Sequence, residues 1–108
     1  MNSSLLLAEA VAQGALSDDE AYEIAQADVI VHGRRREDGT PVYLVVEVSW
    51  GVGPTDVQRA RQRAALLAKL GTPTVPVVAG ARITPAARRL AQDLHVQQLT
   101  NGQVLPPA

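Results

Sequence analysis

The sequence contains no cysteine and only two histidines, His32 and His95. Disulfide bonds, thiolate metal sites and cysteine nucleophiles are therefore excluded, and two histidines argue against a multi-histidine zinc site. The absence of cysteine also favours a cytoplasmic location. The glycine patterns of P-loops and dinucleotide-binding turns are missing too, and no Ser-His-Asp arrangement is present.

Long apolar runs are also absent. The stretch from Leu5 to Ala8 is interrupted at once by Glu9, and no basic segment precedes it. We therefore expect neither a signal peptide nor a membrane span, and no membrane partner.

The 108 residues are 46% hydrophobic and 19% charged, which is the composition of one ordinary globular domain. We expect this domain to span residues 1–105, with residues 106–108 as a loose tail. Charge is divided unevenly: residues 1–56 hold ten acidic residues and three arginines, whereas residues 57–108 hold six arginines, Lys69 and a single acid, Asp93. This division predicts a polarised surface unless folding brings the two halves together.

Hydrophobic patterning and capping signals predict eight elements in the order ααββαβαβ, and therefore an α/β fold with a mixed sheet flanked by helices. The expected helices cover 3–14, 17–26, 55–70 and 84–94, and the expected strands cover 28–32, 41–48, 74–79 and 96–99. Thr55 and Gln58 have the spacing of a capping box for the third helix. An apolar stripe marks the buried face of that helix: Val57, Ala60, Ala64, Leu67 and Ala68. Pro76 predicts that the third strand lies at a sheet edge or a bulge.

Asp38 and Gly39 separate two β-branched runs, which predicts a hairpin with a two-residue turn. In that register Val29 faces Val48, and we expect this apolar face to pack against helices. The opposite face then carries Asp28 and Glu47 as diagonal neighbours, about 7–8 Å apart.

Two carboxylates at this spacing can hold one divalent cation, Mg²⁺ or Mn²⁺. Glu47 follows an apolar run, where an ionised group is costly unless it is paired or bound to a cation. In the alternative interpretation, both acids are solvated or pair with Arg34 or Arg61.

Asp28, the following turn, the apolar strand ending in Glu47-Val48-Ser49 and the next helix together resemble the PD-(D/E)XK nuclease superfamily. The resemblance covers residues 20–80 and is strongest to small bacterial members with Glu-Val-Ser in place of Glu-x-Lys. It implies a restriction-endonuclease-like fold in which Asp28 and Glu47 bind magnesium. It also implies that a polar residue on the next helix, Gln58 or Gln62, completes the site.

Ser49 stands where the family carries a lysine that positions and polarises the attacking water. Loss of such a charge contact commonly lowers the rate by about 10²–10³. Arg61 and Arg34 are candidates for a displaced cation, and Glu9, Glu20 and Glu23 are candidates for the additional helical carboxylate that some nucleases use.

Other features have a functional and a structural interpretation. Arg34 and Arg36 share the hairpin face of the two acids and can contact phosphates, or else belong to a solvated tip. Trp50 can stack on a base or close the core. Arg59 and Arg63 are interpreted as solubilising residues.

Taken together, these patterns predict a metal-dependent phosphodiester hydrolase that acts on DNA or RNA, with Asp28, Glu47, Ser49 and Gln58 in its site. The alternative is a catalytically silent relative that binds nucleic acid or another protein, and a purely structural domain is a third possibility. The apolar opening segment, 5–16, is a candidate surface for a homodimer.

Overall fold

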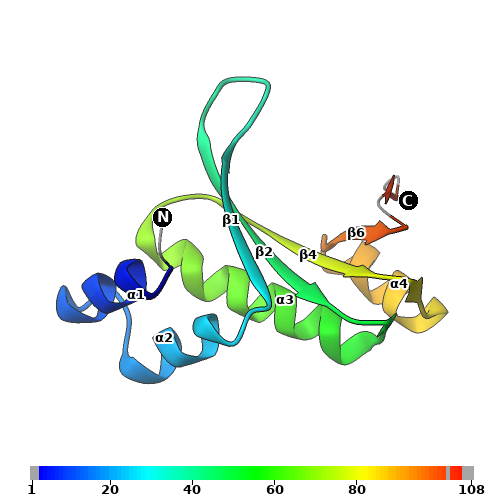
Figure 1. Ribbon diagram of the computed structural model, residues 1–108, viewed down its shortest axis with the longest axis horizontal. Helices are drawn as coiled ribbons and strands as arrows, with labels where there is room; N and C mark the ends of the chain where they lie inside the picture. The colour runs from blue at the N-terminus through cyan, green and yellow to red at the C-terminus, as the bar shows by residue number, and fades with distance from the viewer. Residues whose placement is uncertain (1–2, 102, 106–108) are drawn as a thin grey trace.

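The computed structural model describes residues 3–101 and 103–105, which form an α/β fold (Figure 1). Its elements are α1 (Ser3–Ala12), α2 (Asp18–Ala25), β1 (Val29–Arg34), β2 (Pro41–Val48), β3 (Gly51–Val52), α3 (Pro54–Leu67), a 3₁₀ turn (Ala68–Leu70), β4 (Thr74–Gly80), β5 (Arg82–Ile83), α4 (Pro85–Asp93), β6 (Gln97–Thr100) and β7 (Gln103–Val104). The predicted α/β class and mixed sheet are confirmed, whereas the short strands β3, β5 and β7 were not predicted. None of the helices in the described ranges is long and apolar enough to cross a membrane.

The main sheet has the order β1-β2-β4-β6-β7, and β3 pairs with β5 in a separate two-stranded sheet. β1 and β2 are antiparallel, β2, β4 and β6 are parallel, and β7 returns antiparallel to β6. Helices α3 and α4 form the two crossovers between the parallel strands. Because both crossovers advance in the same direction across the sheet, right-handed connections place both helices on one face.

The helix termini follow local sequence signals with one exception. Ser17 and Glu20 form the capping box that begins α2, and Thr84 accepts a hydrogen bond from the Ala87 N–H at the start of α4. The predicted cap of α3 at Thr55 is wrong. Pro54 occupies the first turn, so the helix begins one residue earlier, and the Gly53 N–H donates to Asp56 Oδ2 at 3.0 Å.

The predicted stripe on α3 forms the centre of the core. Val57, Ala60, Ala64 and Leu67 are buried, but Ala68 is exposed because the helix tightens there into the 3₁₀ turn. One half of the core joins α1, α2 and α3 to β2, and the other joins α3 and α4 to β4. These clusters are Leu7, Ala10, Leu16, Ile24, Tyr43, Val45, Ala64 and Leu67, and Val52, Val57, Ala60, Val78, Ala87, Ala91 and Val96.

The hairpin register differs by two residues from the prediction. Val29 pairs with Val46, and the connection is a longer loop in which the Arg35 N–H donates to the Thr40 carbonyl at 2.8 Å. A two-residue type I′ turn needs positive φ at both central positions, and of the predicted pair only Gly39 has it, at +72°. Asp38 instead accepts hydrogen bonds from the N–H and hydroxyl of Thr40, which stabilises the longer loop.

The hairpin also presents the opposite face from the one predicted. Four residues of the main sheet belong to the core clusters or pack against them: Ile30, Tyr43, Val45 and Val78. All four lie on the same face of the sheet as Glu47. The face of Val29, Val31 and Val48 carries no helix, and these three side chains are exposed. Both faces of β2 are apolar over most of their length, so alternation alone did not distinguish them.

Pro76 lies in the central strand β4, so the predicted edge position is wrong. β6 begins to pair with β4 only at Val77, one residue after the proline. The missing N–H of Pro76 therefore interrupts no ladder on the β6 side, which explains why a central strand tolerates this residue.

Candidate carboxylate and arginine site

Asp28 and Glu47 meet at the base of the hairpin. The register of β1 and β2 places them directly opposite each other, not diagonally, and the Val48 N–H donates to Asp28 Oδ2 at 2.8 Å. Asp28 is exposed at the end of β1, whereas Glu47 faces the helices and is only 5% exposed. The two carboxylates thus lie side by side at the boundary between solvent and core.

One carboxylate oxygen of Glu47 is paired and the other is not. Oε1 accepts a hydrogen bond from Arg63 Nη1 at 2.6 Å, whereas Oε2 is buried without a hydrogen-bond partner. Burial raises the pKa of Glu47 above its ordinary value, the adjacent Asp28 charge adds to this effect, and Arg63 opposes it. An orphaned buried carboxylate oxygen is costly unless a ligand satisfies it.

Arg63 is the cation of this site and not the solubilising surface residue that its sequence pattern predicts. It is 7% exposed, and its Nε lies 3.2 Å from Glu23 Oε1 while Nη1 also donates to the Gln26 carbonyl at 3.3 Å. The guanidinium therefore connects α3 to both α2 and β2. Arg61 and Arg63 lie on opposite flanks of the apolar stripe, so the sequence pattern did not show which flank α2 covers.

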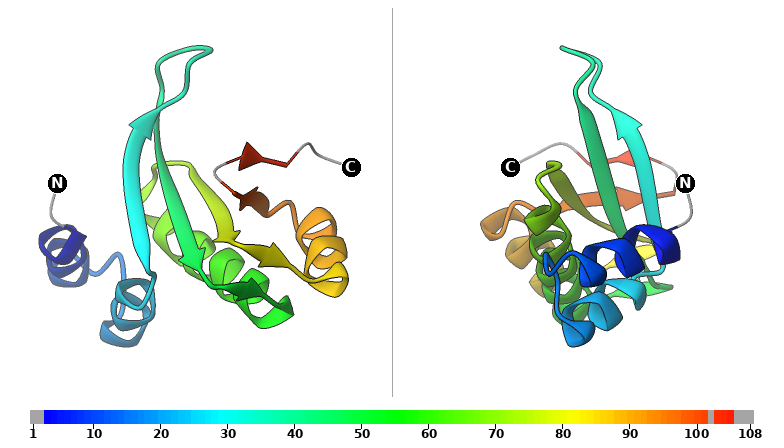
Figure 2. Two further views of the ribbon diagram at one scale, coloured as in Figure 1. Left: turned by 45° about the vertical axis from the view of Figure 1, so that its right-hand side comes forward. Right: turned by 90° about the vertical axis from the view of Figure 1, so that its left-hand side faces the viewer.

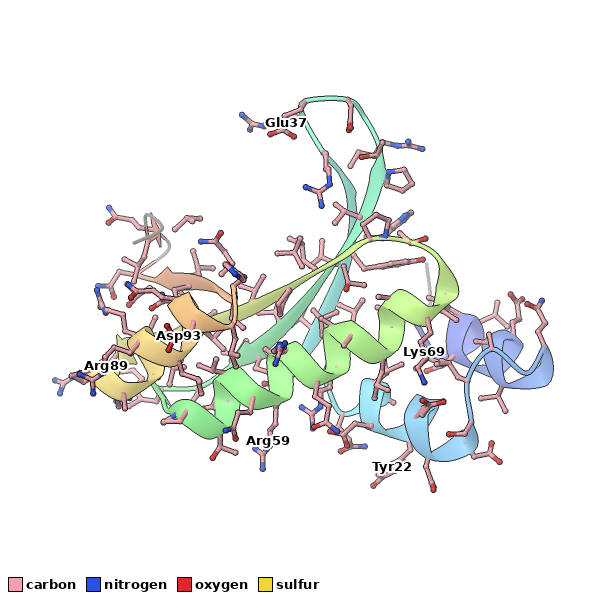
Figure 3. The ribbon with its side chains drawn as sticks, turned by 180° about the vertical axis from the view of Figure 1, so that it is seen from behind. Tyr22, Glu37, Arg59, Lys69, Arg89 and Asp93 are labelled. Atoms are coloured by element: carbon pink, nitrogen blue, oxygen red, sulfur yellow. The ribbon has the colours of Figure 1, made fainter. Side chains whose placement is uncertain are left out.

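Among the three candidate helical carboxylates, Glu23 is the one at the site. Glu20 instead forms an ion pair with Lys69, whose side chain points toward α2 (Figure 3), and this hydrogen bond lowers the pKa of Glu20. Basic residues of the second half of the chain thus pair with acidic residues of the first. Folding therefore neutralises part of the charge division seen in the sequence.

Gln58 and Arg61 are not brought to the two acids. Together with Gln62, Ala65 and Leu94 they line an open groove on the α4 side of α3, whereas Arg63 lies on the α2 side. The expectation that Gln58 or Gln62 completes the site, or that Arg61 replaces the missing lysine there, is not met by this arrangement.

Arg34 and Arg36 lie at the far end of the hairpin, which projects from the body of the molecule (Figure 2). Arg34 Nη1 donates to the Gly39 carbonyl at 2.9 Å and so closes the loop. Six residues of extended strand separate Arg34 from Asp28, which corresponds to about 20 Å. These arginines are therefore too far away to act on a group held by the two acids.

Ser49 and Trp50 follow β2 directly. The Ser49 hydroxyl donates to the Gly51 carbonyl at 3.0 Å, and its N–H donates to Ala79. Trp50 is 81% exposed, so the interpretation that it closes the core is wrong. The Ser49 side chain stabilises the turn. It supplies no charge at the position where PD-(D/E)XK nucleases have a lysine.

Gly80 allows β4 to approach this turn. A Cβ at position 80 would lie 2.1 Å from the Ser49 carbonyl oxygen, whereas a Cβ at Gly51 has open space around it. We therefore expect Gly80→Ala to lower the free energy of unfolding by about 1–3 kcal/mol, because the backbone must shift. Chemical denaturation measures this loss, and Gly51→Ala is the matched control. Equal stability of the two variants would contradict the close approach.

The donor set suits a hard divalent cation. Magnesium sites commonly use one or two carboxylates, with water and substrate phosphate as the remaining ligands. Asp28 and Glu47 are two such carboxylates, and Oε2 of Glu47 is buried without a hydrogen-bond partner. Across the described residues no group of three or more His, Cys, Asp or Glu side chains is arranged to hold a metal. Comparison of the chain with family models, curated proteins and solved structures gives no match.

Proposed function

We propose that this protein is a divalent-metal-dependent phosphodiester hydrolase acting on DNA or RNA. The observation that carries the proposal is the pair formed by Asp28 and Glu47, in which a buried carboxylate oxygen of Glu47 has no partner. The resemblance to PD-(D/E)XK nucleases supports it, because the same two residues match the acidic positions of that motif.

In this proposal Asp28 and Glu47 hold Mg²⁺ or Mn²⁺, which when bound lowers the pKa of water and neutralises phosphate charge. Asp28 supplies an exposed carboxylate that a substrate phosphate can approach from solvent. Glu47 supplies Oε2, while its other oxygen is fixed by Arg63. Water adds across the P–O bond, so the products are a phosphate monoester and a free hydroxyl group.

Arg63 supplies the positive charge that Ser49 lacks. It favours the ionised form of Glu47, which a metal ligand requires, because its own charge opposes the effect of burial. A guanidinium stays protonated near neutral pH, so Arg63 orients and neutralises but does not accept the proton of the attacking water.

Substrate contacts extend along the hairpin in this proposal. Arg34 and Arg36 lie about 20 Å from Asp28, which is about six steps of a nucleic-acid strand. They would therefore contact the phosphate backbone away from the cleaved bond and strengthen binding without taking part in hydrolysis.

A second candidate is a catalytically silent relative that binds nucleic acid or protein. The contacts of Arg63 favour it, because they already neutralise one oxygen of Glu47 and engage Glu23. In that case Arg63 takes the place of a metal ion as the counter-charge of the buried carboxylate.

Metal binding distinguishes the two candidates without knowledge of the substrate. For the hydrolase we expect calorimetric Mn²⁺ binding by the wild type, loss of at least about tenfold in affinity in Glu47→Gln, and no change in Glu37→Gln at the hairpin tip. Affinity should rise with pH through the raised pKa of Glu47, because the metal displaces a proton. A wild type that binds no Mn²⁺, with or without a short oligonucleotide, favours the silent relative.

A further inference from the structure

Exposed apolar side chains gather on one side of the molecule. Seven large hydrophobic residues in the described ranges are exposed, and four of them, Val29, Val31, Val48 and Val104, lie on the open face of the sheet. Trp50 follows Val48 by two residues in the chain and is the most exposed of the seven at 81%. An apolar surface of this kind on a folded domain marks an interaction site.

The strand registers show how continuous this open face is. Its three rows run across the sheet and contain aliphatic residues and one glutamine, with no charged side chain: Val31, Leu44 and Val75; Val29, Val46, Val77 and Gln97; Val48, Ala79, Leu99 and Val104. Only Val77, at the centre, is buried; the others are exposed or half-buried. All helix contacts of the core clusters use the opposite face.

The opening segment, in contrast, does not provide the apolar surface expected from the sequence. Leu7, Ala10 and Leu16 belong to the core of their own chain, and among the large apolar side chains of that segment only Leu5 is largely exposed. The segment therefore lacks the exposed apolar surface that a dimer contact through it would need.

We propose that a second copy of this chain covers the open face, sheet against sheet. An uncharged aliphatic surface is complementary to itself, so a two-fold arrangement lets each row pack against valines and leucines of the partner. Because the rows contain no charged side chain, such an interface buries no unpaired charge, and the face has no charge that would attract a charged partner. This inference does not depend on the proposed hydrolase.

The dimensions of the face set the strength of this contact. The three rows contain 11 residues. Each covers about 4.8 Å across the sheet and about 6.6 Å along its strand, which gives a footprint of about 350 Å² per copy. Two such faces bury about 700 Å², below the range of stable interfaces, so we infer a weak and reversible dimer, not an obligate one.

Trp50 reports directly on this contact because it is the only tryptophan in the chain. It is exposed in the single copy and follows Val48, a residue of the open face, by two positions in the chain. Its fluorescence emission should therefore shift to shorter wavelength as the dimer forms, and this readout needs no substitution.

The experiment combines sedimentation velocity with tryptophan emission between about 1 and 100 μM, a range that brackets micromolar dissociation. For the wild type we expect the mean mass to rise from near that of the monomer toward that of the dimer across this range, with a parallel shift of the emission maximum. The double variant Val31→Lys/Val48→Lys should dissociate at concentrations at least about tenfold higher. Tyr22→Lys, on the exposed surface of α2 (Figure 3), should behave like the wild type.

Three outcomes overturn the proposal. These are a monomeric wild type at the highest concentration, dimerisation of the double variant at wild-type concentrations with a native circular dichroism spectrum, and dimerisation without any change in Trp50 emission. If the double variant does not fold, the dilution series of the wild type still decides between dimer and monomer, and Trp50 emission decides which face is covered.

Discussion

Replacement of Arg63 by methionine is expected to lower the free energy of unfolding by about 3–5 kcal/mol, the loss typical when one partner of a buried ion pair is removed. Arg63 and Glu47 are both almost fully buried, and methionine fills a similar volume without charge. Glu47 would then have no counter-charge for Oε1, while Oε2 is already without a partner. The loss in free energy of unfolding arises from the buried Glu47 carboxylate that has no counter-charge, and not from lost packing.

This loss should depend on pH in a defined direction. Burial already raises the pKa of Glu47 in the folded protein, and removal of Arg63 raises it further. The folded state then binds a proton that the unfolded state has released, so stability decreases as pH rises above the unfolded pKa of Glu47. The penalty of Arg63→Met is therefore smaller at acidic pH and larger near neutral pH.

Urea denaturation of the wild type and three variants measures this effect. Arg61→Met, on the other flank of α3, should change stability by less than about 0.5 kcal/mol because Arg61 is exposed. The double variant Glu47→Leu/Arg63→Met should regain most of the lost stability, since an apolar pair often replaces a buried ion pair without cost. A pH-independent loss in Arg63→Met, or no recovery in the double variant, would contradict this account.

Substitution of Asp28 by asparagine should reduce metal-dependent cleavage of nucleic acid by about 10²–10³ or more if the protein is a hydrolase. Asparagine retains a carbonyl oxygen that can accept the hydrogen bond from Val48, so the end of β1 should remain in place. The variant therefore removes the charge needed for the cation while preserving the geometry of the hairpin.

Cleavage of fluorescent single-stranded and double-stranded DNA and RNA, with Mg²⁺, Mn²⁺ or a chelator, provides the measurement. Asp93→Asn, an exposed acid at the end of α4 (Figure 3), is the matched control and should leave the rate unchanged. Metal-dependent cleavage that survives Asp28→Asn would refute the assigned site. No cleavage by a wild type that also binds no Mn²⁺ would leave the silent relative as the supported function.

Local signals in the sequence account for much of the fold. Ser17 with Glu20, and Thr84 with Pro85, specified two helix starts because caps act over a single turn of backbone. The β-branched runs on either side of Asp38-Gly39 specified an antiparallel hairpin. Asp28 and Glu47 were expected to be neighbours, and they remain on one face even though the register differs by two residues, since side chains alternate with a period of two.

Only the tertiary structure decided between positions that look alike in the local sequence: the two faces of β2 and the two arginines beside the apolar stripe of α3. The alternation in β2 is apolar on both faces, so only the packing of α1, α2 and α3 determined that Glu47 is covered and that Val48 is exposed. Likewise, Arg61 and Arg63 lie on the two sides of the same apolar stripe. Arg63 is buried and paired with Glu47 because α2 packs on its side of α3. Periodicity along a chain assigns a side chain to a face, but which face is buried depends on the elements that pack against it.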